Sequence, residues 1–143
     1  MNLPGAEPVI DLIEAFRRSK TMFAAVDLGI FDRLAVGPKG PLELAGTGSV
    51  DTMARLLDAC VSLGFLEKNG DRYSNTAVTS AYLCRTSPNT MAGYISYSNR
   101  ALYPMWGHLE YAVREGTHRW KQTFGLEGGS LFSHFYRTDE DRR

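Results

Sequence analysis

Residues 49–76 constrain the fold of this chain more than any other stretch, because they predict a helix that runs directly into a β-hairpin. The helix is expected over residues 50–63, where apolar side chains recur at helical spacing and form one apolar face. Those side chains are Met53, Leu56, Leu57, Cys60 and Leu63. Ser49 can cap the start of the helix, and Gly64 can adopt the left-handed conformation that ends it.

The hairpin signal follows at once. Two short strands over 65–68 and 72–74 flank Asn69-Gly70, a dipeptide that strongly favours a tight turn between antiparallel strands. A helix followed by such a wing is typical of winged-helix domains. That shape has two different uses: it reads DNA, or it pairs protein subunits.

The rest of the chain predicts helices and no further sheet. They are expected at 8–28, 30–34, 41–45 and 76–83, from residue 87 or 89 to about 103, from Pro104 to Glu115, and at 130–137, with a loose connection over 117–129. The predicted fold class is therefore mainly α, a winged helix with additional dimerisation helices. We expect two parts: residues 1–85 with the winged helix, and 86–143 as a helical extension.

Two of these helices carry more apolar residues than one buried face needs. The helix over 91–106 has aromatic and aliphatic side chains on more than one side, and the N-terminal helix is rich in them for an end element. Such helices need cover beyond a small core, so part of this surface is predicted to be an interface. An ordinary helical core is the alternative interpretation.

Charge and composition limit the function classes. The 143 residues include 16 Lys and Arg against 16 Asp and Glu, whereas a dedicated nucleic-acid binder is usually basic. The sequence has no run long enough to cross a bilayer and no visible secretory signal. Cys60 and Cys84 lie in different elements, which does not suggest a disulfide framework. A reduced, cytoplasmic location is expected.

The sequence contains no complete catalytic or metal-binding pattern. His108, His118 and His134 do not have the spacing of metal ligands, and neither cysteine has the context of an activated nucleophile. We therefore assign no catalytic, cofactor-binding or metal-binding residue.

DNA reading is weakly supported on the predicted recognition helix. Its solvent face presents Arg55 between Asp51 and Asp58, whereas base edges and phosphates require several donors and cations. The wing is charge-balanced as well. We expect neither a nucleic acid nor a membrane as partner, although a winged-helix transcription regulator stays open as an alternative.

Three stretches resemble a known family. They are SKTMFAAVDLGIFDRL, RLLDACVSLGFLEKNGDRYSNT and WGHLEYAVREGTH, the last followed by TFG, LF and FYR. The chain resembles, over nearly its whole length, the N-terminal part of the acetylserotonin O-methyltransferase-like small-molecule O-methyltransferases, which use S-adenosylmethionine. The resemblance implies a homodimer of intertwined winged-helix domains, in which helices of one subunit help to close the pocket of the other.

The resemblance also implies site residues. Contacts to a small aromatic substrate, similar to N-acetylserotonin, would come from Tyr97, Trp106 and Phe132, with Met105 and Phe124 as neighbours. The dimer interface and the partner's pocket would involve Phe16, Ser19 and Phe23. Aromatic and thioether side chains suit the faces of a flat indole or phenol. Simple packing in a core or interface is the alternative for each.

The family's cofactor domain is expected to follow Arg143, so these residues alone are expected to be inactive although the full-length enzyme would use S-adenosylmethionine. Three hypotheses follow: the dimerisation and pocket-closing domain of an O-methyltransferase, a DNA-binding regulator, or a stand-alone interaction module.

Overall fold

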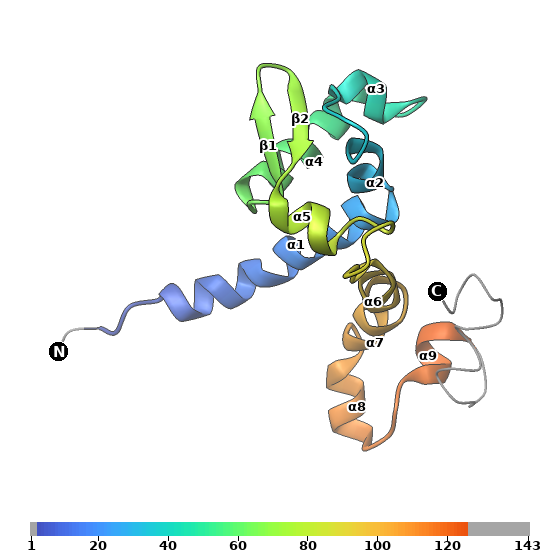
Figure 1. The fold of residues 1–143 in the computed structure, drawn as a ribbon. Helices are drawn as coiled ribbons and strands as arrows, with labels where there is room; N and C mark the ends of the chain where they lie inside the picture. Colours follow the sequence, from blue (N-terminus) through green and yellow to red (C-terminus); the bar gives the residue numbers. More distant parts are fainter. Residues whose placement is uncertain (1–2, 126–143) are drawn as a thin grey trace. The chain divides into compact units, whose positions relative to one another are not determined.

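The computed structural model describes residues 3–125, and the chain divides into two compact units, Met1–Ala92 and Gly93–Arg143 (Figure 1). Each unit is described by itself. The division expected from the sequence, between residues 85 and 86, stays a prediction.

The first unit contains five helices and one hairpin within its described residues. Along the chain they are α1 (Glu7–Asp27), α2 (Ile30–Leu34), α3 (Pro41–Ala45), α4 (Val50–Ser62), β1 (Leu66–Asn69), β2 (Arg72–Asn75) and α5 (Ala77–Tyr82). The predicted helices and hairpin of this part are all confirmed, with bounds that differ by one or two residues. Mainly α with a two-stranded wing is the fold class that the sequence predicted.

The start and end of α4 depend on local chemistry. The Ser49 side-chain oxygen accepts a hydrogen bond from the Thr52 backbone N–H at 3.2 Å, as an N-cap does. Gly64 has a φ of 79°, a backbone conformation that favours glycine, and lets the chain reverse from α4 into β1.

The hairpin turn differs from the predicted one by a single position. Asn69 pairs with Arg72 as the last pair of the antiparallel ladder, so the two turn residues are Gly70 and Asp71. Only Gly70 has a positive φ, whereas an Asn-Gly turn of the expected type needs two such residues. Asn69 therefore belongs to β1. Outside the hairpin, Lys39 forms an isolated antiparallel β-bridge with Tyr73 of β2, through two backbone hydrogen bonds.

The core of this unit lies where α1, α2, α4, α5 and the hairpin meet. Its buried apolar side chains include Val26, Ile30, Phe31, Leu34, Leu44, Leu57, Cys60, Leu66 and Tyr73. Phe31 meets Phe65 edge to face, with ring centroids 6.3 Å apart. Only the C-terminal end of α1 enters this core, through Ala25 and Val26.

One continuous helical stretch runs from residue 92 to 106. It consists of α6 (Ala92–Tyr97), the π-helix η1 (Ser98–Leu102) and α7 (Tyr103–Trp106). Pro104 has no N–H, and its ring crowds the carbonyl four residues earlier, so the wider π turns before it accommodate the ring. The predicted start at residue 87 or 89 was wrong, because hydrogen-bonded turns at Ser87 and Thr90 come first.

The helix predicted from Pro104 to Glu115 is broken after Trp106, so its continuity was wrong, whereas its end at Glu115 is confirmed. Gly107 and His108 form a turn before α8 (Leu109–Glu115), which ends at Gly116 with a φ of 67°. The loose connection expected over 117–129 contains a further helix, α9 (Trp120–Phe124). The Trp120 and Phe124 rings stabilise it by packing against each other in a tilted arrangement, with centroids 4.8 Å apart. The helix predicted at 130–137 lies outside the described residues.

Candidate functional site: an apolar helix face and an aromatic pocket

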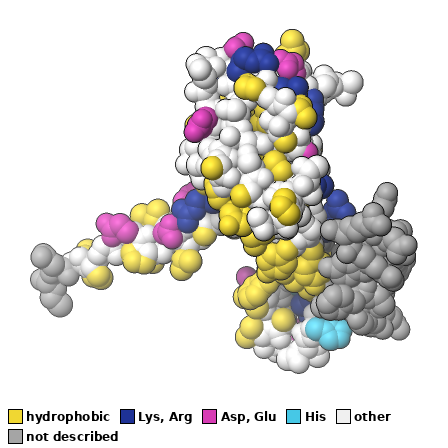
Figure 2. All heavy atoms as spheres, viewed as in Figure 1, with side chains coloured by type: hydrophobic (Ala, Val, Ile, Leu, Met, Phe, Trp, Pro, Cys, Tyr) yellow, Lys and Arg dark blue, Asp and Glu magenta, His cyan; other side chains and the backbone are white. Residues whose placement is uncertain are grey.

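The first candidate surface is the apolar face of α1. Along its N-terminal half, large apolar side chains stay exposed: Val9 62%, Ile10 56%, Leu12 75%, Ile13 55% and Phe16 52%. Figure 2 shows hydrophobic atoms along this helix between charged ones. Exposed contiguous apolar surface of this kind marks an interaction site in a folded protein.

Four of the charged side chains of α1 are paired with one another within the helix itself. Arg17 contacts Glu14 at 2.9 Å, and Arg18 contacts Asp11 at 2.8 Å. These pairs neutralise the polar side, so the apolar face is the surface of α1 that is left to meet a partner. Ser19 is exposed on the same helix, and Phe23 is half-buried nearer the core.

The second candidate surface is a pocket in the unit that starts at Gly93. Among the described residues, an open cavity of about 190 Å³ is lined by Met105, Trp106, Leu109, Ala112 and Arg119. A thioether, an indole and two aliphatic side chains form its walls, and the guanidinium of Arg119 is the charged group beside them. This mixture suits a flat, mostly apolar ligand that carries one polar edge.

Arg119 also forms the corner between α8 and α9. Its guanidinium pairs with the Glu115 carboxylate at 2.7 Å and donates to the Gln122 side chain at 3.2 Å. It donates to the Thr117 hydroxyl and to the His118 carbonyl as well. The Arg119 side chain is only 12% exposed, so this corner of the pocket wall is well braced.

The structure brings together two of the residues that the resemblance assigned to the substrate. Met105 and Trp106 are neighbours in the cavity lining, whereas half-buried Tyr97 and Phe124 are not among the lining residues described. Phe132 lies outside the described residues. These substrate contacts stay predictions.

The cavity is also lined by Leu109, Ala112 and Arg119, none of which was expected from the sequence. Leu109 and Ala112 follow Met105 at intervals of four and three residues, a helical spacing that could have indicated a shared face.

A polar cluster locks the wing against α4. The Asp58 carboxylate accepts hydrogen bonds from the Lys68 ammonium at 2.7 Å and from the Tyr73 hydroxyl at 2.6 Å. Lys68, and then Tyr73, lower the pKa of Asp58. Burial, and then Asp58, raise the pKa of Tyr73, and the hydrogen bond to Asp58 raises that of Lys68. The cluster keeps the carboxylate ionised and the wing in place.

Three cations of α4 and the hairpin pair with neighbouring acids. Besides Lys68, Arg55 pairs with Asp51 at 3.0 Å, and Arg72 pairs with Glu43 at 3.1 Å. A DNA-reading face needs cations directed at phosphates, and these point at carboxylates instead. These ion pairs leave Lys68, Arg55 and Arg72 less available to contact phosphates.

Both cysteines are free and buried. Burial raises the pKa of Cys60 to about 11, and burial followed by the charge of Asp32 raises that of Cys84, so both thiols are protonated near neutral pH. Within residues 3–125, no group of three or more His, Cys, Asp or Glu side chains is placed to hold a metal ion. Nor is any helix of that range both long and apolar enough to span a membrane.

Comparison with known families identifies the winged-helix part. Residues 10–85, more than half of the chain, match the family described as the O-methyltransferase dimerisation domain. The chain belongs to this family. The resemblance seen in the sequence is thereby confirmed.

Curated proteins are also similar to this chain. Acetylserotonin O-methyltransferase of Macaca mulatta is 42% identical over 136 residues, which cover 89% of this chain and 39% of the relative. The Homo sapiens protein is 40% identical over 141 residues, which cover 92% of this chain and 41% of the relative. The chain thus spans about two fifths of the length of these relatives.

Solved structures show the same fold. Human N-acetylserotonin methyltransferase in complex with SAM superposes with a TM-score of 0.84 at 36% identity, over 99% of this chain and 44% of that one. PigF with SAH superposes with a TM-score of 0.86 at 25% identity, over 96% of this chain and 42% of that one.

Proposed function

We propose that this chain pairs two subunits of an S-adenosylmethionine-dependent O-methyltransferase and supplies part of the pocket for a small aromatic hydroxyl compound. The exposed apolar face of α1 carries this proposal, because a family of dimerisation domains explains why such a face exists. A second copy of the chain is the partner, and helices of the two copies intertwine. The pair acts in the cytoplasm, where the two free thiols stay reduced.

The cofactor is assigned to the longer enzyme and to none of the described residues. S-adenosylmethionine would supply the methyl group, as SAM-bound and SAH-bound neighbours suggest. Within the described residues, the two strands form a hairpin, and neither leads into a glycine-rich loop and helix that could cradle a nucleotide. The contribution of this chain is orientation: it holds the acceptor's ring in a fixed pose.

Light scattering of the purified chain tests the pairing. We expect a mass of twice the 15.9 kDa of one chain. A mass of one chain at every concentration would contradict the proposal. Salt-dependent binding to duplex DNA with sequence preference would instead favour the transcription-regulator alternative.

A graft tests the pocket. Residues 1–143 replace the matching N-terminal part of human acetylserotonin O-methyltransferase, and methyl transfer from S-adenosylmethionine to N-acetylserotonin is measured. We expect activity, and we expect Trp106→Ala to raise KM because the indole wall of the cavity is lost. Val113→Ala is the matched control, since Val113 is exposed on α8 and does not line the cavity. An active graft whose KM is the same with either substitution would refute the pocket assignment.

A further inference from the structure

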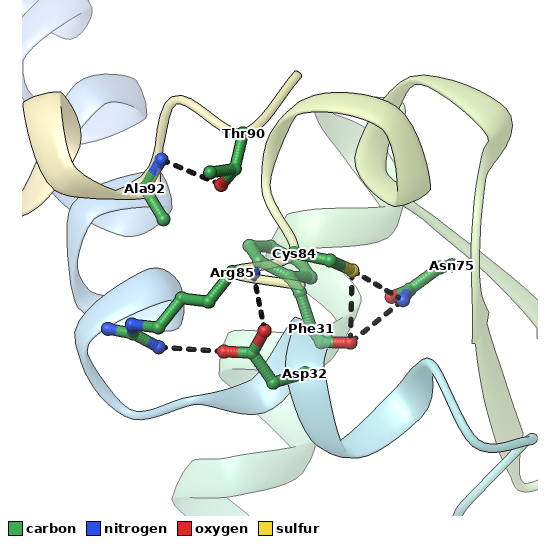
Figure 3. A network of polar contacts seen from close by, with 7 residues as sticks. All are labelled: Phe31, Asp32, Asn75, Cys84, Arg85, Thr90 and Ala92. Carbon is green, nitrogen blue, oxygen red and sulfur yellow. Dashed lines mark hydrogen bonds and ion pairs between the residues drawn. The ribbon is translucent and has the colours of Figure 1, made fainter. Parts of the chain in front are cut away.

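Within the first unit, Asp32 connects the short helix α2 to the segment that follows α5 (Figure 3). The guanidinium of Arg85 contacts one Asp32 oxygen at 2.7 Å, and the backbone N–H of Arg85 donates to the other at 2.6 Å. The side chain of Asp32 is 27% exposed, and that of Arg85 is 44% exposed. One carboxylate thus holds both the side chain and the backbone of a residue in a distant segment of the same unit.

The preceding residue, Phe31, holds α2 on the core side. Its carbonyl accepts from the Asn75 amide at 2.8 Å and from the buried Cys84 thiol at 3.4 Å. Figure 3 shows these groups converging from α2, from the end of β2 and from the segment after α5. The first turn of α2 is therefore bonded on its core side and, through Asp32, on its exposed side.

The following residue, Arg33, connects α2 to α3. Its guanidinium donates to the backbone carbonyl of Leu44 at 2.6 Å and to that of Glu43. These carbonyls belong to the last turn of α3, where backbone oxygens have no partner within the helix. Three consecutive residues thus hold α2 to three other segments, all within Met1–Ala92.

The pairing helix α1 joins this fixed helix at Gly29, a junction that we call the elbow. Gly29 has a φ of 68° between the end of α1 and the start of α2. Its N–H donates to the Val26 carbonyl at 3.0 Å, and its carbonyl accepts from the Arg33 N–H at 3.1 Å. α1 also packs against α4, so the elbow and that contact together set the direction of α1.

The direction of α1 is sensitive to the elbow, because only Ala25 and Val26 of this helix are buried. At about 1.5 Å per residue, Glu7 lies about 27 Å along the axis from Ala25. A tilt of about 10° would therefore move that end by about 5 Å. Successive turns of a helix are about 5.4 Å apart, so such a shift would place ridges against ridges, instead of grooves, in a packed helix pair.

We propose that Asp32 and Arg85 are positioning residues for subunit pairing, which hold α2 so that α1 presents its apolar face in the orientation that a second copy requires. Phe31 contributes a backbone carbonyl that any residue would supply, whereas the charged pair depends on the identity of both side chains. Neither charged residue belongs to α1. This inference rests on the proposed function, because a second copy is the partner there.

Spin labels measure the direction of α1 within one chain. Both native cysteines are buried, so cysteines introduced by Glu7→Cys on α1 and Glu67→Cys on β1, at exposed positions, take up the labels selectively. Labelled protein is diluted with unlabelled protein of the same variant, which leaves the distance within one chain. We expect Asp32→Ala, which removes both bonds to Arg85, to shift this distance or broaden its distribution by about 5 Å, from the tilt above.

Sedimentation equilibrium measures the consequence for pairing. We expect the dimer Kd to rise about tenfold in Asp32→Ala, although the substitution lies outside α1. Arg85→Gln removes the ion pair but keeps the backbone bond to Asp32, so both of its effects should be smaller. Arg85→Lys keeps the positive charge and should restore part of the native distance.

Arg72→Gln is the matched control. Arg72 pairs with Glu43 at 3.1 Å and has a side chain 50% exposed, close to the 44% of Arg85. This pair connects β2 to α3 and leaves α2 untouched, so the label distance and the Kd should stay unchanged. Urea titration of each variant separates direction from general stability, because a lower free energy of unfolding does not by itself move labels in the folded protein.

The outcomes are distinct from those of the pairing test. An unchanged label distance in Asp32→Ala would overturn the positioning role, as would a shifted distance with an unchanged Kd. An equal shift in Arg72→Gln would overturn it as well. A single-chain mass of the unsubstituted protein would instead overturn the proposed function, whatever the label distance is.

Discussion

The substitution Ile13→Asp tests the apolar face of α1 most sharply. Ile13 is 55% exposed in the single chain, and burial of an isoleucine side chain contributes about 1.5–3 kcal/mol, so the remaining half contributes about 1 kcal/mol per copy. In a symmetric dimer every substitution counts twice. Placing an unpaired carboxylate there costs at least about 1 kcal/mol more in each copy. The sum is about 4 kcal/mol, or about a thousandfold rise in the dimer Kd.

Sedimentation equilibrium over a wide concentration range measures this Kd. Ile13→Gln removes the apolar group without adding charge and favours the helix, so it should weaken pairing by a smaller factor. Val36→Asp is the control, because Val36 is also exposed but follows α2, away from α1. Circular dichroism checks that the variants are folded. An unchanged Kd in Ile13→Asp, or equal weakening by Val36→Asp, would contradict the assignment of the apolar face of α1 to the dimer interface.

Three further predictions concern the core, a thiol and the pocket corner. Leu57→Ala, at a fully buried site of α4, should lower the free energy of unfolding by about 2–5 kcal/mol in urea titrations. Val50→Ala, at the exposed start of the same helix, should lower it by less than about 1 kcal/mol, and equal losses would contradict the assigned core. The pKa of Cys60 is about 11 in the folded state against an ordinary 9.0, so the folded state keeps the thiol proton to higher pH than the unfolded state does. The free energy of unfolding should therefore fall by up to about 3 kcal/mol as pH rises from 9 to 11, relative to Cys60→Ala. Parallel curves of unfolding free energy against pH for the two proteins would disprove this. Arg119→Gln should accelerate amide exchange in α9 about tenfold, because the pair with Glu115 is lost, and Arg114→Gln should not; no change in α9 would exclude the bracing role.

The helices and the hairpin of the first unit could be predicted because the residues that start and end them act on their near neighbours in the chain. Ser49 caps the helix that follows it, and Gly64 ends that helix, through contacts within a few residues along the chain. The hairpin was found for the same reason, although its turn is shifted by one residue, since ladder pairing rather than the dipeptide decides which residues turn. The surplus of apolar side chains on α1 likewise indicated an interface, because the number of apolar residues in a helix can be read directly from its sequence.

The helices after residue 86 were harder to place, because their bounds depend on contacts that no short window contains. Pro104 indicated a kink, but the π turns that absorb it and the break at Gly107 depend on how the neighbouring turns bond. α9 is a short helix held by the tilted contact between the Trp120 and Phe124 rings and by the ion pair of Arg119 with Glu115. Of the residues that line the pocket, the sequence pointed to Met105 and Trp106, and helical spacing could have added Leu109 and Ala112. Arg119 reaches the pocket from another element, so its place could not be predicted.

By itself, the sequence determined the winged helix, the family resemblance and the excess of apolar surface, because helical periodicity, caps and turn residues act over a few positions. Which charges neutralise one another depends on tertiary packing, because the paired residues come from separate elements of the fold. Asp32 and Arg85 are 53 positions apart in the chain, and Asp58 of α4 bonds to Tyr73 of β2. Neither pair has a spacing that recurs within one helix or strand, so neither could be recognised from the sequence. Such contacts exist only after the core has brought distant segments together.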